Sequence, residues 1–251
     1  MPGLAVAVLV TACGVVAAIP DPAVAAVPDI ASAISFAWEV APNAPALSGA
    51  PVTPTSDTSE IEGLQYRLSW TGLDVAPSGV WDEATTQSLK RFQWKFNMAQ
   101  TGEANSKVVA KLAAVARDGA VDPRCLGPGI TLCVDKTQRL TRYIKDGETI
   151  LKVDTNFGPE KGDPKFGQYS LTREGAFKIF WKSPDSRSNL YGMVLPYFMA
   201  FDGGEGFHFS KYFSTNGYAD TSMGCATFND LAKAKWIYEN TPMNTKVVIY
   251  H

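Results

Sequence analysis

The sequence has few of the residues that build disulfide scaffolds and strongly basic surfaces. Four cysteines in 251 residues exclude a small fold held mainly by disulfides, and 45% hydrophobic residues exclude a disordered chain. Lysine and arginine are missing before Arg67, and residues 67–251 carry 23 basic against 19 acidic side chains. This excess is too small and too dispersed to indicate a nucleic-acid partner.

The chain also lacks an apolar run as long as the roughly 20 residues that a membrane-spanning helix needs. Residues 3–19 are small and apolar and stop at Pro20, which is typical of a secretion signal, although no basic residue precedes them. Within the run, residues 10–13 (Val-Thr-Ala-Cys) resemble a bacterial lipobox, in which Cys13 would carry lipid. Cleavage after Ala-Val-Ala at 23–25 is the alternative. The lipobox and the cleavage site both predict an extracytoplasmic protein. If Cys13 is lipidated, the lipid would anchor the protein to the outer face of the cytoplasmic membrane and would be its one membrane attachment.

Residues 20–59 hold seven of the sixteen prolines and consist mainly of Ala, Pro, Val, Ser and Thr. Such a composition favours an extended chain without a packed element. We therefore predict a linker over residues 20–59, which would hold the folded part away from a membrane.

Helical periodicity begins at residue 60. Leucine and isoleucine recur at helical spacing to about Trp70, a second apolar stripe runs through Leu89, Phe92 and Phe96, and a third follows Asn105 or Ser106. These stripes predict a small domain of three helices over residues 60–118. Because it contains neither His nor Cys, we expect a binding or spacer module.

Four motifs in this stretch resemble the three-helix peptidoglycan-binding domain. They are LQYRL at 64–68, SGVWDEAT at 78–85, LKRFQ at 89–93 and TGEAN at 101–105. The resemblance implies a noncatalytic unit that binds the bacterial cell wall; a helical spacer that has lost its ligand is the alternative.

After residue 122 the period changes from helical to two, which predicts strands. We expect them at 130–134, 139–144, 148–155, 176–181, 193–201, 206–209 and 246–250, with one helix over 230–240 capped by Asn229. The fold class is therefore α+β overall: the small helical domain, then a mostly β domain over 123–251, of the sandwich or partly closed barrel type with one helix.

The remaining cysteines divide into a pair and a single residue. Cys125 and Cys133 are separated by a stretch with two Gly and one Pro that can turn the chain back, so we predict a disulfide between them. Cys225 is either a small buried residue or a nucleophile. His208, seventeen positions earlier, can take a thiol proton, and Gly224 leaves room for backbone N–H groups at an oxyanion. His251 is terminal and is expected in solvent.

The pattern around these residues resembles the L,D-transpeptidase catalytic domain of the YkuD type. The hallmark is a His followed downstream by Ser/Thr-His-Gly-Cys. Here sixteen residues separate His208 from Cys225, and Ser222 and Gly224 also match the motif. The similarity extends over residues 130–250. Three positions depart from the family pattern: Met223 replaces its second His, Thr227 replaces its Arg or Asn, and Arg173 replaces its Pro.

The resemblance implies a reaction without metal or organic cofactor. Cys225 would attack the carbonyl of the third residue of a peptidoglycan stem tetrapeptide, release D-Ala and form a thioester, which an amine of a second stem peptide resolves into a 3-3 cross-link. His208 would be the base, oriented by the carbonyl of Phe209, while Ser222, Met223 and Gly224 would support the oxyanion. The resemblance also implies carbapenem β-lactams as inhibitors. Candidate cleft-lining residues are Tyr197, Phe201, Tyr212 and Tyr218.

Two alternatives to the transpeptidase follow from these residues. Met223 and Thr227 allow a catalytically weak or silent relative that only binds the wall. A cysteine hydrolase of the L,D-carboxypeptidase kind, which admits water in place of the amine, fits the same motif.

Overall fold

The computed structural model describes residues 44–161, 170–189 and 192–251, and all of these fall in one compact unit. The predicted signal at 1–19, Cys13 and the first part of the predicted linker lie outside the described residues. In the part of the chain that is described, no helix combines the length and the apolar character needed to cross a membrane.

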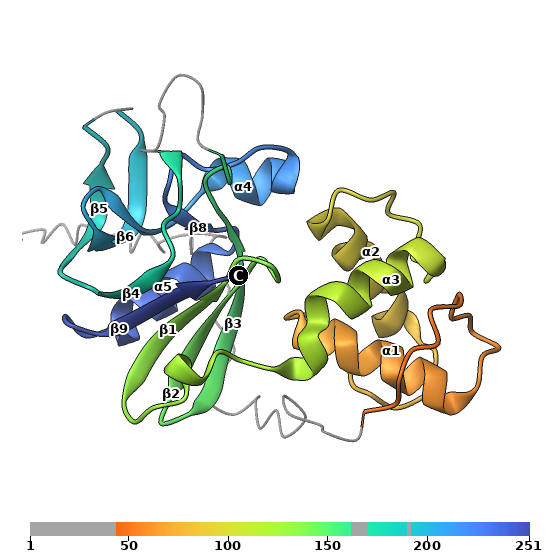
Figure 1. Ribbon diagram of the computed structural model, residues 1–251. Helices are drawn as coiled ribbons and strands as arrows, with labels where there is room; N and C mark the ends of the chain where they lie inside the picture. The colour runs from red at the N-terminus through yellow and green to blue at the C-terminus, as the bar shows by residue number, and fades with distance from the viewer. Residues whose placement is uncertain (1–43, 162–169, 190–191) are drawn as a thin grey trace, which may run out of the picture. The chain divides into compact units, whose positions relative to one another are not determined.

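The helical part consists of three helices (Figure 1): α1 (Thr58–Trp70), α2 (Glu83–Lys95) and α3 (Ser106–Ala116). Asp82 caps α2 by accepting from the Thr85 N–H, and Asn105 caps α3. The apolar stripes predicted from the sequence meet in one core, which includes Leu64, Leu68, Leu89, Phe92, Val109 and Leu112. Hydrophobic periodicity was thus sufficient to predict this domain.

The linker prediction is wrong for the described residues before α1. Val52 is buried in the helical core and its N–H donates to the carbonyl of Ala104, at 2.9 Å. Arg67 Nη1 donates to the carbonyl of Pro45, at 2.7 Å. A proline-rich composition predicted an extended chain without packed elements, but residues 44–57 bend and turn, and they pack on the helices.

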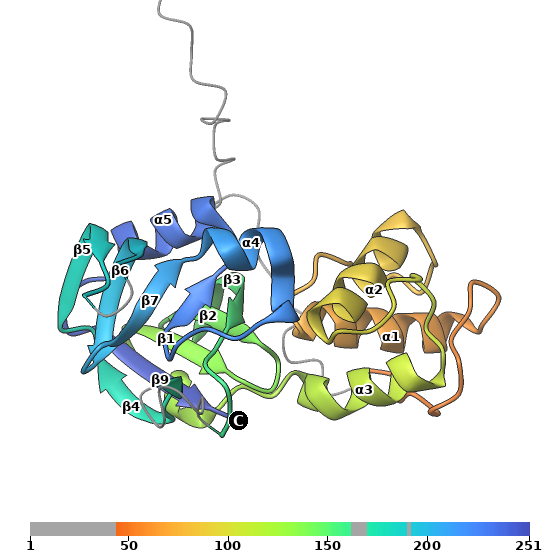
Figure 2. The same ribbon diagram turned by 90° about the horizontal axis from the view of Figure 1, so that it is seen from above.

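The second part is a single curled sheet that forms a half-barrel (Figures 1 and 2). Its strand order is β4-β9-β1-β2-β3-β8-β7-β6-β5, and all neighbours are antiparallel except β1·β9 and β7·β8. The bounds are β1 (Ile130–Asp135), β2 (Leu140–Lys145), β3 (Glu148–Asn156), β4 (Gly175–Lys178), β5 (Trp181–Arg187), β6 (Val194–Asp202), β7 (Glu205–Phe209), β8 (Ala226–Phe228) and β9 (Lys246–Tyr250).

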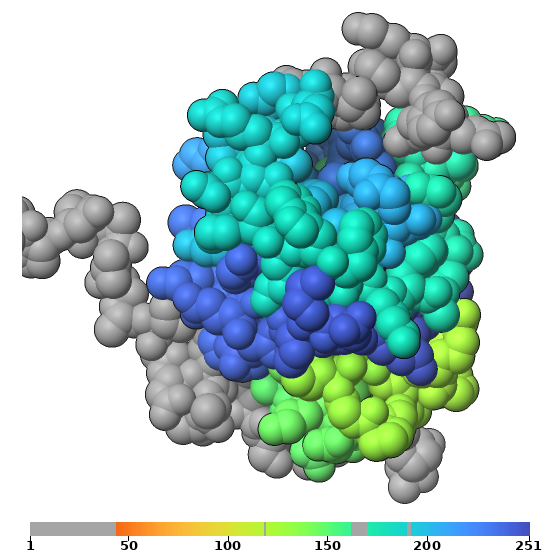
Figure 3. Space-filling model, turned by 90° about the vertical axis from the view of Figure 1, so that its left-hand side faces the viewer, coloured from red at the N-terminus to blue at the C-terminus, as the bar shows by residue number. Residues whose placement is uncertain are grey.

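Residues 176–181, predicted as one strand, divide between β4 and β5. Only Ile179 and Phe180 separate these strands, although they lie at opposite ends of the strand order. The sheet must therefore curl until its two edges approach each other. The space-filling view shows the face covered by β4, β5, β6 and β9 (Figure 3).

Helix α5 (Leu231–Asn240) covers one face of the sheet, and a short helix, α4 (Lys211–Asn216), follows β7. The cap of α5 is Asp230, which accepts from the Lys233 N–H, and not the predicted Asn229. Helix α4, strand β8 and all of β5 after Trp181 were not predicted. β5 is an edge strand with exposed polar residues and Pro184, so it lacks the apolar alternation of a buried strand. Three-residue 3-10 turns complete the fold, at Arg117–Gly119, Pro123–Cys125 and Gly217–Ala219.

The helices are joined to the sheet through their C-terminal ends. The last carbonyls of a helix have no partner within it and carry partial negative charge, so cations and amides stabilise them. Side chains from β2, β3 and the turn before β2 supply these groups, in the bonds Arg142 Nη2 to Trp70 O, Lys152 Nζ to Ser69 O, Arg139 Nη1 to Lys95 O, and Gln138 Nε2 to Val115 O and Ala116 O. All three helices are thus docked by the same region of the sheet.

Candidate active site

His208 and Cys225 come together because β7 and β8 are neighbouring parallel strands. His208 is in register with Thr227, and Phe207 with Ala226. Side chains alternate between the faces of a strand, so Cys225, Thr227 and His208 project from the same face of the sheet. We call this face the His208 face.

The ring of His208 is held in one tautomer. Its Nδ1 lies 2.8 Å from the carbonyl oxygen of Phe209, and because a carbonyl only accepts, Nδ1 carries the proton. Nε2 is then the lone-pair nitrogen. The side chain is 7% exposed, and burial lowers the pKa of His208 to about 4, although the bond to Phe209 opposes this shift. His208 is therefore a neutral base at pH 7.

Cys225 is also neutral at pH 7. Burial raises the pKa of the Cys225 thiol to about 11, the backbone hydrogen bond with Gly206 lowers it, and the nearby Glu205 carboxylate raises it. The residue is reduced and partly buried. At pH 7 Cys225 is therefore a thiol and His208 a neutral imidazole. A nucleophilic attack by Cys225 would require His208 to accept the thiol proton during the attack.

One aromatic ring covers both residues. Phe198 of β6 has its ring centroid 6.3 Å from that of His208, and Cys225 packs against the cluster formed by Leu195, Phe198 and Ala200. A Cβ on Gly206 would approach the Phe198 ring to 2.6 Å, so glycine allows this close cover. Phe198 is therefore one of the residues that bury both side chains.

The segment Ser222–Cys225 is held by a loop from another part of the chain. The Ser222 N–H donates to Phe157 O at 2.8 Å, and the Ser222 hydroxyl donates to the carbonyl of Cys225. Thr172 Oγ1 donates to Gly224 O at 2.7 Å. Gly224 has a φ of +102°, which favours glycine.

Thr172 also accepts from the Gly158 N–H, at 2.9 Å. A Cβ on Gly158 would lie 1.8 Å from the carbonyl oxygen of Ser170, so the two loops are in direct backbone contact. The sequence analysis missed Phe157, Gly158 and Thr172, because no local motif marks a threonine that binds a backbone carbonyl 52 positions away.

Met223, Thr227 and Arg173, the three departures from the family pattern, differ in burial and in contacts. Met223 is 44% exposed, so position 223 faces solvent at the mouth of the site. Thr227 is buried and its hydroxyl donates to Asn156 O at 3.4 Å. Arg173 Nε bonds Glu205 Oε1 at 2.6 Å and Asp202 Oδ2 at 3.1 Å, which ties the Thr172 loop to the turn between β6 and β7.

Glu205 brings negative charge close to the cysteine. The carboxylate is buried, and burial raises the pKa of Glu205 while its bonds to Arg173 lower it. Its charge contributes to the raised thiol pKa of Cys225. Arg173 thus pairs with the carboxylate whose charge contributes to the raised pKa of the Cys225 thiol.

The four predicted cleft aromatics do not gather at Cys225. Phe201 is buried against Phe177 and Phe207, and Tyr197 pairs with Tyr238. Along β6 these two residues alternate with Phe198, so a one-residue offset turns them away from the His208 face. The other two predicted residues, on α4 and the following turn, are treated next.

Tyr212 on α4 is exposed, and Tyr218 is buried between the sheet and the helical domain. The Tyr218 ring packs edge-on against Trp94 of α2, and its hydroxyl donates to Arg139 O at 3.4 Å. The aromatic residue at the cysteine is Phe198, which the sequence analysis did not select.

The remaining predicted site residues lie away from Cys225. Cys125 and Cys133 form a disulfide that joins a 3-10 turn to β1. His251 lies near Glu174, with Nε2 and Oε1 3.4 Å apart. Among the described residues, no group of three His, Cys, Asp or Glu side chains is placed to hold a metal ion.

Comparison with known proteins identifies two regions. Residues 129–249 match the model of the L,D-transpeptidase catalytic domain (YkuD), and residues 57–112 match the model of the peptidoglycan binding domain. Among curated protein sequences, none matches the chain.

Three solved structures of low sequence identity match the chain, and the first of them shares its fold. The L,D-transpeptidase (Yku) from Stackebrandtia nassauensis is 23% identical with a TM-score of 0.52, and the alignment covers 80% of this chain and 98% of that one. The L,D-transpeptidase from Xylanimonas cellulosilytica is 22% identical with the same coverage and a TM-score of 0.47. L,D-transpeptidase 3 from Mycobacterium tuberculosis, in complex with a faropenem-derived adduct, is 15% identical; the alignment covers 50% of this chain and 61% of that one, with a TM-score of 0.38.

Proposed function

This chain combines an L,D-transpeptidase catalytic domain of the YkuD family with a peptidoglycan binding domain, and from this premise we propose that it forms 3-3 cross-links in peptidoglycan. Cys225 is the proposed nucleophile and His208 the proposed base. The substrate is a stem tetrapeptide of the cell wall, and D-Ala is the leaving group.

The observation that carries this proposal is the tautomer of His208. Nδ1–H is bound to Phe209 O, so Nε2 carries the lone pair and can accept a proton. Cys225 projects from the same face of the sheet as His208. A nucleophile, a base and a group that orients the base are the parts required for covalent acyl transfer.

The proposed reaction has two steps. Cys225 Sγ attacks the carbonyl carbon of the third residue while its proton passes to His208 Nε2; the C–N bond then breaks and the nitrogen of D-Ala takes that proton. In the second step an amine of another stem peptide attacks the thioester, a C–N bond replaces the C–S bond, and the thiol is restored. Backbone N–H groups around Gly224 would stabilise the oxyanion in both steps.

Position 223 bears on the rate. Met223 is 44% exposed, and a methionine side chain cannot donate the hydrogen bonds of a histidine. We therefore propose an active enzyme that is slower than members with the complete motif.

A catalytically silent relative is the second candidate, and one observation favours it. The pKa of Cys225 is raised to about 11 and that of His208 is lowered to about 4, so the two groups do not form a thiolate–imidazolium pair at rest. Such a protein would bind the wall without reacting.

Export is part of the proposal. The Cys125–Cys133 disulfide supports an oxidising compartment, and the peptidoglycan binding domain supports a location at the cell wall. The 1–19 segment would direct export, and Cys13, if acylated, would anchor the protein to the outer face of the cytoplasmic membrane. Carbapenems are the proposed inhibitors, through acylation of Cys225.

The test is incubation of the whole protein with tetrapeptide muropeptides, followed by mass analysis. The proposal predicts cross-linked dimers and free D-Ala, and neither with Cys225→Ala. Tripeptides and D-Ala without dimers would assign the hydrolase instead. If the folded protein gives neither product nor carbapenem adduct, the transpeptidase proposal fails and the protein is a catalytically silent relative that binds the wall.

A further inference from the structure

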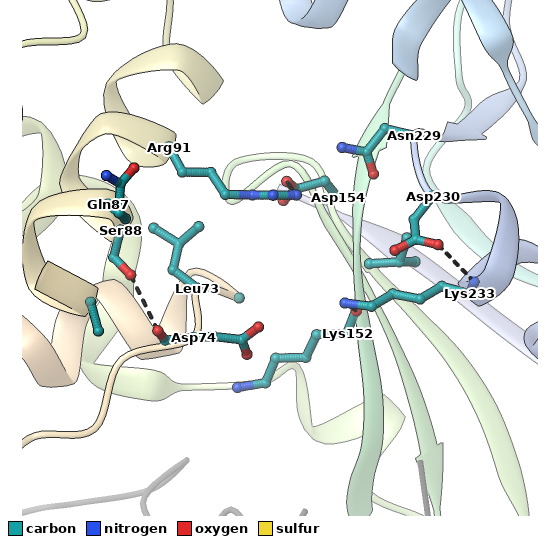
Figure 4. Close-up of a pocket in the computed structure, with 13 residues that line it drawn as sticks. Leu73, Asp74, Gln87, Ser88, Arg91, Lys152, Asp154, Asn229, Asp230 and Lys233 are labelled. Atoms are coloured by element: carbon teal, nitrogen blue, oxygen red, sulfur yellow. Dashed lines mark hydrogen bonds and ion pairs between the residues drawn. The ribbon is translucent and has the colours of Figure 1, made fainter. Parts of the chain in front are cut away.

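A polar groove lies between α2 and the sheet, away from Cys225. It consists of two cavities of about 400 and 630 Å³, which share the residues Gln87, Arg91, Asn229 and Asp230. Arg91 enters from α2, and Asn229, Asp230 and Lys233 enter from the junction of β8 and α5 (Figure 4). Volumes of this size suit small ligands or short peptide arms.

Strand β8 connects the groove to Cys225 of the proposed catalytic pair. Cys225 directly precedes β8 (Ala226–Phe228), and Asn229 directly follows it. Asn229 follows Cys225 by four residues, which is about 13 Å of extended chain. A ligand in the groove therefore lies within about one extended tetrapeptide of the nucleophile.

The charges that line the groove favour an anion. The described residues of the lining contain four cations, which outnumber their three carboxylates: Lys90, Arg91, Lys152 and Lys233 against Asp74, Asp154 and Asp230. Asp154 also pairs with buried Lys95, which adds to the excess of positive charge. Arg91 is 56% exposed and uses Nη2 for Asp154, which leaves further N–H donors of its guanidinium fork toward the groove.

Lys233 adds a second cation. Its Nζ donates to the carbonyl of Lys152 at 3.1 Å, a bond to a neutral group that does not cancel its charge. The N-terminus of α5, from which Lys233 projects, adds positive potential to the same space. Figure 4 shows the ends of Arg91 and Lys233 directed into the cavity from opposite walls.

Asn229 provides a neutral acceptor beside these cations. Its Oδ1 is buried and has no hydrogen-bond partner among the described residues. A buried amide oxygen of this kind is stabilised by an N–H donor. A ligand that carries both a carboxylate and an amide or amine N–H satisfies the groove; a neutral sugar would leave the cations unpaired.

We propose that this groove binds a carboxylate-bearing stem peptide of peptidoglycan, through Arg91 and Lys233 for the carboxylate and Asn229 for an N–H. The proposal rests on the proposed function for the identity of the peptide. It places a second wall contact on a surface that the helical domain and the catalytic domain form together.

The experiment measures binding to the full chain carrying Cys225→Ala, so that no reaction occurs. The probe is the dipeptide γ-D-glutamyl-meso-diaminopimelate, titrated by calorimetry at 50 and 300 mM salt. Lys233→Met is the test variant. Lys235→Met is its matched control, because Lys235 lies on the same helix, is 54% exposed and pairs only weakly with Glu239, at 3.9 Å.

We expect Lys233→Met to weaken the Kd about tenfold and Lys235→Met to change it less than twofold, as loss of a charge-assisted hydrogen bond predicts. Asn229→Ala is expected to weaken the Kd about threefold, and higher salt to weaken binding to the parent. Equal Kd values for the two lysine variants, or no binding to the parent, would overturn the groove site. Binding of tetra-N-acetylchitotetraose in place of the dipeptide, or equal competition by inorganic phosphate, would also overturn it.

A second measurement separates this site from the proposed function. With Cys225 restored, acylation of the parent by a carbapenem is measured by mass analysis and compared with dipeptide binding to the Cys225→Ala chain. If the parent binds the dipeptide but is never acylated, the proposed function fails and the groove site stands. If it is acylated but does not bind the dipeptide, the reverse holds.

Discussion

Lys95 of α2 and Asp154 of β3 form a buried ion pair between the two domains, with Nζ and Oδ1 2.7 Å apart and side chains 0% and 3% exposed. Nζ also donates to Thr71 O at 2.9 Å, and Arg91 holds the second carboxylate oxygen at 3.1 Å. Burial alone would raise the pKa of Asp154, but Lys95 and Arg91 outweigh it and lower that pKa. The helical domain is therefore locked to the sheet by charge as well as by its helix ends.

Lys95→Met should be strongly destabilising, because it leaves the Asp154 carboxylate buried with Arg91 as its remaining cation. Breaking a buried pair from one side typically removes about 3–5 kcal/mol from the free energy of unfolding. Urea unfolding measures this loss. Lys95→Met combined with Asp154→Leu should recover part of it, and a double variant as unstable as the single one would contradict the pairing.

Burial of neutral His208 should make stability depend on pH. The pKa of His208 is about 4 in the folded protein and 6.5 ordinarily. Between pH 6.5 and pH 4 the unfolded chain therefore binds a proton at His208 that the folded protein does not bind. Stability is thus lost as pH falls from 6.5 to 4, by up to about 3 kcal/mol. Unfolding at pH 7 and pH 4.5 should show a smaller difference for His208→Gln than for the parent. Equal differences would mean that His208 titrates normally.

The reactivity of Cys225 should continue to rise at pH values where an ordinary thiol no longer gains reactivity. A thiol with a pKa of about 11 gains thiolate about tenfold for each pH unit up to pH 10, whereas an ordinary thiol levels off near pH 9. Iodoacetamide alkylation followed by mass analysis measures the profile. Phe198→Ala should admit water and move the profile to lower pH; an unchanged profile in a folded variant would show that the ring does not desolvate the thiol.

Met223→His should speed acylation of Cys225 by a carbapenem. One added hydrogen bond is worth about 0.5–1.5 kcal/mol, which corresponds to roughly a twofold to tenfold rate change. Time-resolved mass analysis of the adduct provides the rate, with Met243→His as a control at another exposed methionine. An adduct in Met223→His alone would indicate that methionine silences the natural site.

Local patterns in the sequence predicted most of the helices and strands and selected His208 and Cys225 as the proposed reacting residues. Helical spacing places Leu64, Leu89 and Leu112 in one core, and a period of two predicts most strands, because each pattern reports which face of an element avoids water. His208 and Cys225 were selected by their chemistry together with the resemblance to the L,D-transpeptidase motif, and their roles as base and nucleophile stay a prediction.

Contacts between distant segments were decided only in the tertiary structure. Whether Tyr197 or Phe198 faces the thiol depends on a one-residue register in β6, and the bond from Thr172 to Gly224 joins positions far apart in the chain. Burial, which sets the pKa values of His208 and Cys225, is a property of everything packed around them. The groove at Arg91 and Lys233 likewise exists only where α2 docks on the sheet, because each of its walls is polar surface until the other wall encloses it.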